Sequence, residues 1–145
     1  MDNRLVDDRR CFACGQQNEH GLRLHFEYGE RSARATPAVA RRFGGWSGML
    51  HGGVVTTLLD EAMAHAAIAA GVRAVTARLQ VRFHRPAPSA VPLVLEGVLQ
   101  KRRGRMLELS ATLRGVDGTA YAEGSGRFIA QDAAADRRPE AAPDG

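Results

Sequence analysis

Hydrophobic and polar residues alternate along several stretches of the chain, with the period of two that is typical of strands buried on one face. The alternation is strongest over residues 73–83, where odd-numbered positions from Val75 to Phe83 are apolar and even-numbered positions from Thr76 to Arg82 are polar. A weaker alternating stretch is interrupted by Pro37, which cannot donate to a sheet. The pattern predicts six strands, at residues 22–28, 31–39, 73–83, 91–101, 105–115 and 118–131.

The pattern changes between residues 52 and 71, where apolar residues recur every three or four positions. This spacing is typical of an amphipathic helix. The recurring apolar positions are Val55, Leu58, Leu59, Ala62, Met63 and Ala66. Gly71 ends the run, and the second half of the helix is rich in alanine. Small side chains suit a helix that a sheet wraps closely.

The order of the predicted elements is two strands, one long helix and four strands joined as a meander. Turns are expected at Arg103-Gly104 and Asp117-Gly118. This order predicts an α+β domain in which an antiparallel sheet wraps around one long central helix. We assign residues 1–20 to an N-terminal segment with a Cys-x-x-Cys turn, residues 21–131 to the domain and residues 132–145 to a disordered tail. One helix covers only one sheet face, so a homo-oligomer is expected to cover the rest.

Length and composition fit a single domain of the cytoplasm. The chain has 145 residues, lacks an apolar run long enough to span a membrane and begins with residues too charged for a secretory signal. Its net charge is +4 and its pI is about 9.8. The arginines are dispersed as separate doublets without interleaved aromatic residues. We therefore expect solvated arginines and neither a nucleic-acid nor a membrane partner.

Two cysteines, Cys11 and Cys14, are spaced as half of a zinc site. His20 and His25 follow closely enough to suggest a Cys-Cys-His-His site. Against this, the alternation places His25 on the same strand face as its charged neighbours, and there is no second cysteine pair. Two reduced thiols in a turn are the favoured interpretation, and no metal is expected.

The helix is predicted to begin at Gly52 and Gly53, directly after His51. Glycine lets a ligand approach the backbone, and the first N–H groups of a helix lack intrahelical acceptors. The helix dipole adds positive charge at this end. Such N–H groups can polarise a carbonyl and stabilise a developing oxyanion, each contributing roughly 3 kcal/mol where measured.

Asp60 lies about two turns into the predicted helix, and Glu61 follows it. A carboxylate here can act as a general base on water or as a nucleophile, which indicates acyl transfer to water. The alternative is an ordinary solvated helix side, made up of Thr56, Thr57, Glu61 and His65. Because the sheet is predicted to wrap around the helix, we expect Asp60 to lie in a cleft or an interface.

The common hydrolase motifs are absent. Ser47 does not lie in a Gly-x-Ser-x-Gly turn, so a serine triad with His51 is not supported. We interpret His51 as a residue that orients the loop. The chain also lacks a metal motif of the His-x-x-Glu-His type, so nothing indicates metal-assisted hydrolysis.

Three stretches resemble the hotdog-fold acyl-CoA thioesterases, specifically the PaaI-like branch of the 4-hydroxybenzoyl-CoA thioesterase superfamily. They are CFACGQQNEHGLRLHF near the start, GMLHGGVVTTLLDEAM at the helix and VTARLQVRFHRPAP in the following strand. The resemblance covers most of the chain and implies the hotdog fold. It also implies that Asp60 is the catalytic carboxylate, that the Gly52 N–H, with Gly53 nearby, polarises the thioester carbonyl, and that Thr76 helps to position water.

The resemblance further implies a site shared between protomers, with the carboxylate and the carbonyl-binding loop on different chains, and thus a homodimer that often pairs into a homotetramer. Several relatives carry Asn or Gln six positions before the histidine, where this chain has Gly45. The neighbouring Trp46 is expected to shape the acyl pocket or to pack in an interface. Basic residues are expected to meet the phosphates of coenzyme A; the candidates are Arg78, Arg82, Arg102 and Arg103.

These observations predict hydrolysis of a small or medium acyl-CoA, aromatic or aliphatic, to free acid and CoA. No cofactor is expected, because coenzyme A is part of the substrate. One alternative is a hotdog protein that binds acyl-CoA without hydrolysing it. Another is an enoyl-CoA hydratase, since His65 lies five positions after Asp60, although the motif that surrounds this pair in hydratases is missing.

Overall fold

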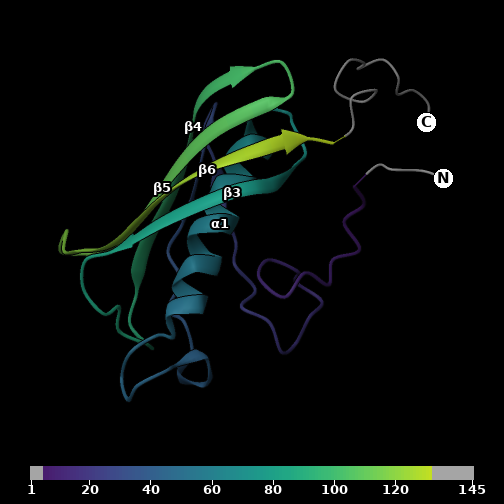
Figure 1. Ribbon diagram of the computed structural model, residues 1–145. Coiled ribbons are helices and arrows are strands. Elements are labelled where there is room, and N and C mark those ends of the chain that lie inside the picture. The colour runs from purple at the N-terminus through teal and green to yellow at the C-terminus, as the bar shows by residue number, and fades with distance from the viewer. Residues whose placement is uncertain (1–4, 132–145) are drawn as a thin grey trace.

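One long helix lies across a curved antiparallel sheet in the computed structural model, which describes residues 5–131 (Figure 1). The helix, α1, spans Gly52–Ala69. The strands are β1 (Glu27–Tyr28), β2 (Ser32–Ala35), β3 (Ala74–Phe83), β4 (Leu93–Arg103), β5 (Met106–Gly115) and β6 (Ala120–Ala130), and a short 3-10 helix spans Arg41–Phe43. The predicted α+β fold is confirmed. The tail predicted at residues 132–145 lies outside the described residues.

The sheet has the strand order β1-β2-β4-β5-β6-β3, and every neighbouring pair is antiparallel. The last four strands follow the predicted ranges closely. Gly104 and Gly118, in the two predicted turns, have φ values of +61° and +92°. Glycine adopts this left-handed conformation without the penalty of a Cβ, so these turns connect the meander as expected.

The first predicted strand is only partly correct, because only Glu27 and Tyr28 pair with β2. Leu24 and Phe26 are buried, as the alternation predicted. The backbone of this stretch is bonded elsewhere: the N–H groups of Leu22 and Leu24 donate to the carbonyls of Phe12 and Ala13 at 2.7 and 2.9 Å. The segment therefore pairs with the N-terminal turn instead of extending the sheet.

The core lies between α1 and the sheet. The largest fully buried side chains come from both layers: Leu58, Leu59 and Met63 from the helix, and Leu93, Leu95, Leu107, Leu109, Leu113 and Phe128 from the strands. Burial of such a side chain stabilises the fold by roughly 1.5–3 kcal/mol. The periodic apolar positions of the sequence thus form the interface between the layers.

A row of small residues lets the helix approach the sheet closely. Ala33, Gly97, Ala111 and Gly124 are consecutive partners across β2, β4, β5 and β6. A Cβ at Gly97 would lie 2.2 Å from the carbonyl oxygen of Ala62 in α1. Only glycine fits at this position, and this contact sets the height of α1 above β4.

β3 forms one edge of the sheet and leaves part of its apolar face uncovered. Val75 is 40% exposed and Phe83 is 54% exposed. The register with β6 shifts between Thr76 and Arg78. An uncovered strand edge is a surface onto which another chain can add.

Within residues 5–131, no helix is long and apolar enough to cross a membrane.

Candidate active site

Asp60 is held between the helix and the edge strand. Its side chain, in the third turn of α1, accepts a hydrogen bond of 2.6 Å from the Thr76 hydroxyl of β3. Asp60 is half-buried. Burial raises the pKa of Asp60, the bond from Thr76 lowers it, and the charge of Glu61 raises it, with a net upward shift. A carboxylate with a raised pKa next to an edge strand is suited to accept a proton.

The N-terminus of α1 is capped by His51. The backbone of His51 is extended, and its Nδ1 accepts a hydrogen bond of 2.8 Å from the Gly53 N–H. Its carbonyl accepts bonds from the N–H groups of Val54 and Val55 at 2.9 and 3.0 Å. His51 therefore caps the start of the helix. Since Nδ1 is an acceptor here, that nitrogen carries no proton in this arrangement.

This cap distinguishes the two glycines that were predicted to hold the substrate carbonyl. The Gly53 N–H is bonded to His51, whereas the Gly52 N–H has no hydrogen-bond partner among residues 5–131. Gly52 is exposed, and a Cβ placed on it would approach nothing closer than the Phe83 ring at 3.9 Å. Gly52 is thus the free donor at the positive end of the helix.

Gly45 and Trp46 lie in an exposed loop before the helix. The Gly45 N–H donates to the carbonyl of Met49 at 2.9 Å, and a Cβ at Gly45 would lie 3.3 Å from the Cα of His51. The Trp46 side chain is 82% exposed in the single chain. Ser47 belongs to the same exposed loop and has no contact with His51 that would make a triad. The loop lies beside the capped helix end.

Gly52 and Asp60 of one chain are separated along the helix axis. Asp60 lies eight positions after Gly52 in α1, and a helix rises 1.5 Å per residue, so their backbones lie about 12 Å apart along the axis. A water activated by Asp60 must lie within about 3 Å of the carboxylate. Asp60 and the Gly52 N–H of the same chain therefore lie at different levels along α1.

A second polar cluster surrounds Glu61 on another side of the helix. The Glu61 Oε2 lies 3.3 Å from His65 Nε2, and His65 Nδ1 is hydrogen-bonded to the Tyr28 hydroxyl at 2.8 Å. The Glu61 and His65 side chains are only 15% and 14% exposed, so the alternative that they belong to a solvated helix side is wrong. His65 is paired with Glu61 and Tyr28, not with Asp60, which leaves the hydratase alternative without support from this arrangement.

The cluster also contains both cysteines, which are free thiols. The Cys11 Sγ lies 3.9 Å from Glu61 Oε2. Burial of Glu61 alone would raise its pKa, but hydrogen bonds from His65 and Cys14 outweigh burial, and the pKa is lowered. The Glu61–His65 spacing was visible in the sequence. The contact with a cysteine fifty positions away had no sequence signal.

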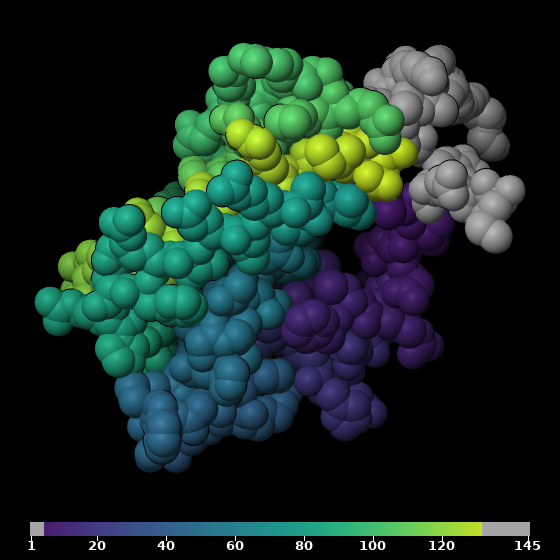
Figure 2. All heavy atoms as spheres, in the orientation of Figure 1, coloured from purple at the N-terminus to yellow at the C-terminus, as the bar shows by residue number. Residues whose placement is uncertain are grey.

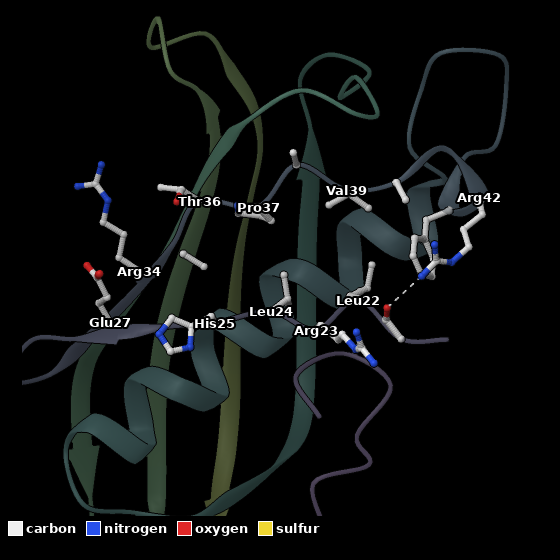
Figure 3. Close-up of a pocket in the computed structure, with 15 residues that line it drawn as sticks. Leu22, Arg23, Leu24, His25, Glu27, Arg34, Thr36, Pro37, Val39 and Arg42 are labelled. Carbon is white, nitrogen blue, oxygen red and sulfur yellow. Dashed lines mark hydrogen bonds between the residues drawn. The ribbon is translucent and has the colours of Figure 1, made fainter. Parts of the chain in front are cut away.

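The two histidines that the sequence suggested as zinc ligands, His20 and His25, do not join the cysteines in the group of metal-ligating atoms found within residues 5–131. His20 is exposed and 3.8 Å from Glu19. His25 lines a cavity of about 440 Å³ together with Arg23, Arg34 and Thr36, and neither cysteine lines it (Figure 3). The Cys-Cys-His-His arrangement is therefore not formed.

The four arginines considered for coenzyme A lie on two strands. Arg78 and Arg82 belong to β3, and Arg102 and Arg103 to the end of β4. Arg78 pairs in register with Arg127 of β6, and both line a cavity of about 330 Å³ on the sheet. Arg78 lies two positions after Thr76 on the same strand.

A long helix packed on a six-stranded antiparallel sheet, with a carboxylate and a free helix N-terminus, defines a protein of the hotdog class. The chain belongs to the thioesterase superfamily, whose family model matches residues 47–122. These residues include α1 and β3 to β5 and carry most of the candidate site. The resemblance noted from the sequence is confirmed at the level of the superfamily.

Relatives and solved structures agree with this assignment. Acyl-coenzyme A thioesterase THEM4 of Bos taurus is 39% identical over 89 residues, which cover 61% of this chain and 36% of that protein. The match thus spans little more than a third of the curated relative. A thioesterase superfamily protein of known crystal structure is 31% identical, with a TM-score of 0.79 over 83% of this chain and 60% of that one. The PaaI protein of E. coli shares the fold, with a TM-score of 0.70, 20% identity and coverage of 75% of this chain and 80% of its own.

Proposed function

We propose that the protein is a thioesterase that hydrolyses a small or medium acyl-CoA, aromatic or aliphatic, to the free acid and CoA. The observation that carries this proposal is the half-buried Asp60, held by the Thr76 hydroxyl at 2.6 Å beside the edge strand. Membership of the thioesterase superfamily supports it, as does the name of the THEM4 relatives.

In the proposed reaction, Asp60 is the general base. It accepts a proton from a water molecule while the water oxygen attacks the thioester carbonyl carbon. Thr76 holds the carboxylate and positions the water. The carbonyl oxygen becomes an oxyanion that a Gly52 N–H stabilises, and the C–S bond then breaks to release CoA. Each role uses a group that has the required chemistry in the structure.

The oxyanion donor comes from a second copy of the chain. The resemblance noted from the sequence implies a site shared between protomers, and the separation of about 12 Å between the backbones of Gly52 and Asp60 along one helix supports a donor from a different chain. The exposed edge of β3, which carries Thr76, is the surface that we propose meets the partner. A homodimer is therefore the smallest active unit, and pairing of dimers into a homotetramer would cover further sheet surface.

Coenzyme A is proposed to lie on the surface near β3, with Arg78 at one of its phosphates. Arg78 follows Thr76 by two positions on β3 and lines a cavity with Arg127 and Glu108, so its guanidinium is near the proposed reaction centre. Trp46, exposed in the single chain, is proposed to contact the acyl group. No cofactor is required by this reaction.

The substitution Asp60→Asn tests the proposal. The amide keeps the shape of the side chain but cannot accept the proton of water, so kcat is expected to fall by on the order of a hundredfold or more. Thiol release should be measured over aromatic, short-chain and long-chain acyl-CoAs. Glu123→Gln, which changes an exposed acid on β6, is the matched control and should retain the wild-type rate.

A wild-type rate for the Asp60→Asn variant would contradict the mechanism. Saturable binding of acyl-CoAs by the wild-type protein in calorimetry, with no thiol released from any of them, would instead identify a non-catalytic acyl-CoA-binding protein.

A further inference from the structure

The N-terminal turn and helix α1 bring three metal-ligating side chains together. The Sγ atoms of Cys11 and Cys14 and a carboxylate oxygen of Glu61 all lie within 4.8 Å of one another. All three residues are partly buried. In Figure 2 the N-terminal segment, drawn in purple, lies against the blue surface of α1. This cluster has no part in the proposed thioester hydrolysis.

Backbone hydrogen bonds fix the turn that carries both cysteines. Cys11 Sγ accepts hydrogen bonds from the backbone N–H groups of Ala13 and Cys14 at 3.3 and 3.5 Å. The Gly15 N–H donates to the Cys11 carbonyl at 2.8 Å, and a Cβ at Gly15 would lie 2.4 Å from the Cys11 nitrogen. Only glycine permits so tight a closure.

Glu61 is held in place by the residues behind it. His65 Nε2 lies 3.3 Å from its carboxylate, and the Tyr28 hydroxyl fixes the other ring nitrogen of His65 at 2.8 Å. The ring of Phe26 stacks on the imidazole with centroids 4.3 Å apart. Metal-ligating side chains are characteristically oriented by such outer partners. His65 is therefore a positioning residue for Glu61.

We propose that Cys11, Cys14 and Glu61 bind one zinc ion, with a water molecule as the fourth ligand. Two thiolates and a carboxylate suit zinc better than magnesium or calcium, which prefer oxygen ligands alone. In a tetrahedral site with bonds of about 2.0–2.3 Å, ligand atoms lie about 3.3–3.8 Å apart. The present separation of 3.9 Å between Cys11 Sγ and Glu61 Oε2 is already close to this range.

A neighbouring cavity gives the ion and its water access to the cluster. The cavity has a volume of about 350 Å³ and is lined by Cys11, Cys14, Glu61 and His65, among others. This site differs from the one suggested by sequence spacing, because its third ligand comes from α1 and not from His20 or His25. The bound ion would tie the N-terminal turn to the central helix.

Zinc binding should be tested on the full chain, freed of any tag, kept reduced with a phosphine and depleted of metal. Competition with a chromophoric chelator gives the zinc affinity and stoichiometry. Cobalt(II) reports thiolate ligands by its charge-transfer absorption and tetrahedral geometry by its visible bands. The variants are Cys14→Ser and Glu61→Gln, and the matched controls are His20→Ala and His25→Ala. No acyl-CoA is needed, so the result is independent of the proposed hydrolysis.

We expect one zinc ion per chain, a thiolate–cobalt absorption band and a melting temperature that rises when zinc is added. Cys14→Ser should weaken zinc binding by on the order of a hundredfold or more, Glu61→Gln by about tenfold or more, and the two histidine controls should match the wild type. Wild-type affinity in either ligand variant would overturn the proposal. A wild-type chain that binds no zinc, or that only forms a Cys11–Cys14 disulfide when oxidised, would also overturn it.

Discussion

Asp60 is subject to two opposing influences. Burial favours its neutral form and raises the pKa, whereas the Thr76 hydroxyl favours the carboxylate and lowers it. Burial is the larger of the two, and the charge of Glu61 adds to it. The net upward shift makes the Asp60 carboxylate a stronger base than that of an exposed aspartate.

Removal of the Thr76 hydroxyl should shift the pH profile of hydrolysis. Activity requires ionised Asp60, so kcat/KM falls as the pH drops through the pKa of this group. Because the bond from Thr76 lowers that pKa, Thr76→Val should raise it and move the acid limb to higher pH. Thr76→Ser keeps a hydroxyl and should keep the wild-type profile. An unchanged acid limb in Thr76→Val, measured by thiol release across pH, would show that Asp60 is not the titrating base.

The residues differ in how far the sequence could reveal their environment. Asp60 and Thr76 were predicted to act together from the family resemblance, and the structure brings them into contact. Glu61 could be read as solvated because helical spacing alone cannot show what covers a helix face. Its cover is the turn with Cys11, and contacts between positions so distant in the chain leave no local periodicity.

The beginning of α1 can be tested as an element, because its first position tolerates proline. Gly52 follows His51, whose extended backbone (ψ 139°) is the conformation required before proline. Gly52→Pro removes the N–H while preserving the helix start. We expect kcat to fall by about 10²–10³-fold. Gly52→Ala retains the N–H and should stay close to wild type. Circular dichroism checks that the helix content is unchanged; equal rates for the two variants would exclude the Gly52 N–H as the oxyanion donor.

The contact between α1 and β4 depends on the absence of a side chain at Gly97. A methyl group there would overlap the Ala62 carbonyl at 2.2 Å, and both partners are backbone in packed elements. We expect Gly97→Ala to lower the free energy of unfolding by about 3 kcal/mol or more, measured by urea denaturation. Gly124→Ala, in the same row but with its nearest atom at 3.4 Å, is the control and should cost clearly less. A similar cost for both would mean that close approach at Gly97 is unimportant.

Elements with strong periodicity and glycine turns were predicted best. β4 to β6 each place one face on the core, and their side-chain pattern reflects this burial. β3 follows its predicted range, although none of its residues is fully buried in the single chain. The stretch around Leu24 also alternates and is buried on the predicted side. Its hydrogen bonds, however, go to the N-terminal turn. The alternation of side chains predicts which residues are buried. It does not predict which segment accepts the backbone hydrogen bonds of the strand, and only the folded structure shows this.

The whole molecule, as a proposed dimer, can be tested by mixing two inactive variants. Each site is proposed to take Asp60 from one chain and Gly52 from the other. A mixed dimer of Asp60→Asn and Gly52→Pro chains then contains one site with both substitutions and one intact site. With random pairing, half of the dimers are mixed, so about a quarter of the wild-type activity should return.

The measurement is thiol release after the two variants are co-expressed or allowed to exchange subunits. Each variant treated alone provides the background. Mixtures that stay at that background while mass spectrometry shows mixed dimers would refute the two-chain site and leave the role of Asp60 to be judged from its own variant.

The uncovered edge of β3 has a consequence for how the protein must be assembled in the cell. Backbone groups and apolar side chains on an open edge attract any extended chain that is available. If the proposed dimer forms through this edge, a newly made copy can pair with a second copy or with another extended chain, and the outcome depends on how quickly it meets a second copy. Translation of many copies from one mRNA would favour pairing of two copies of this chain, because newly made copies are then close to one another.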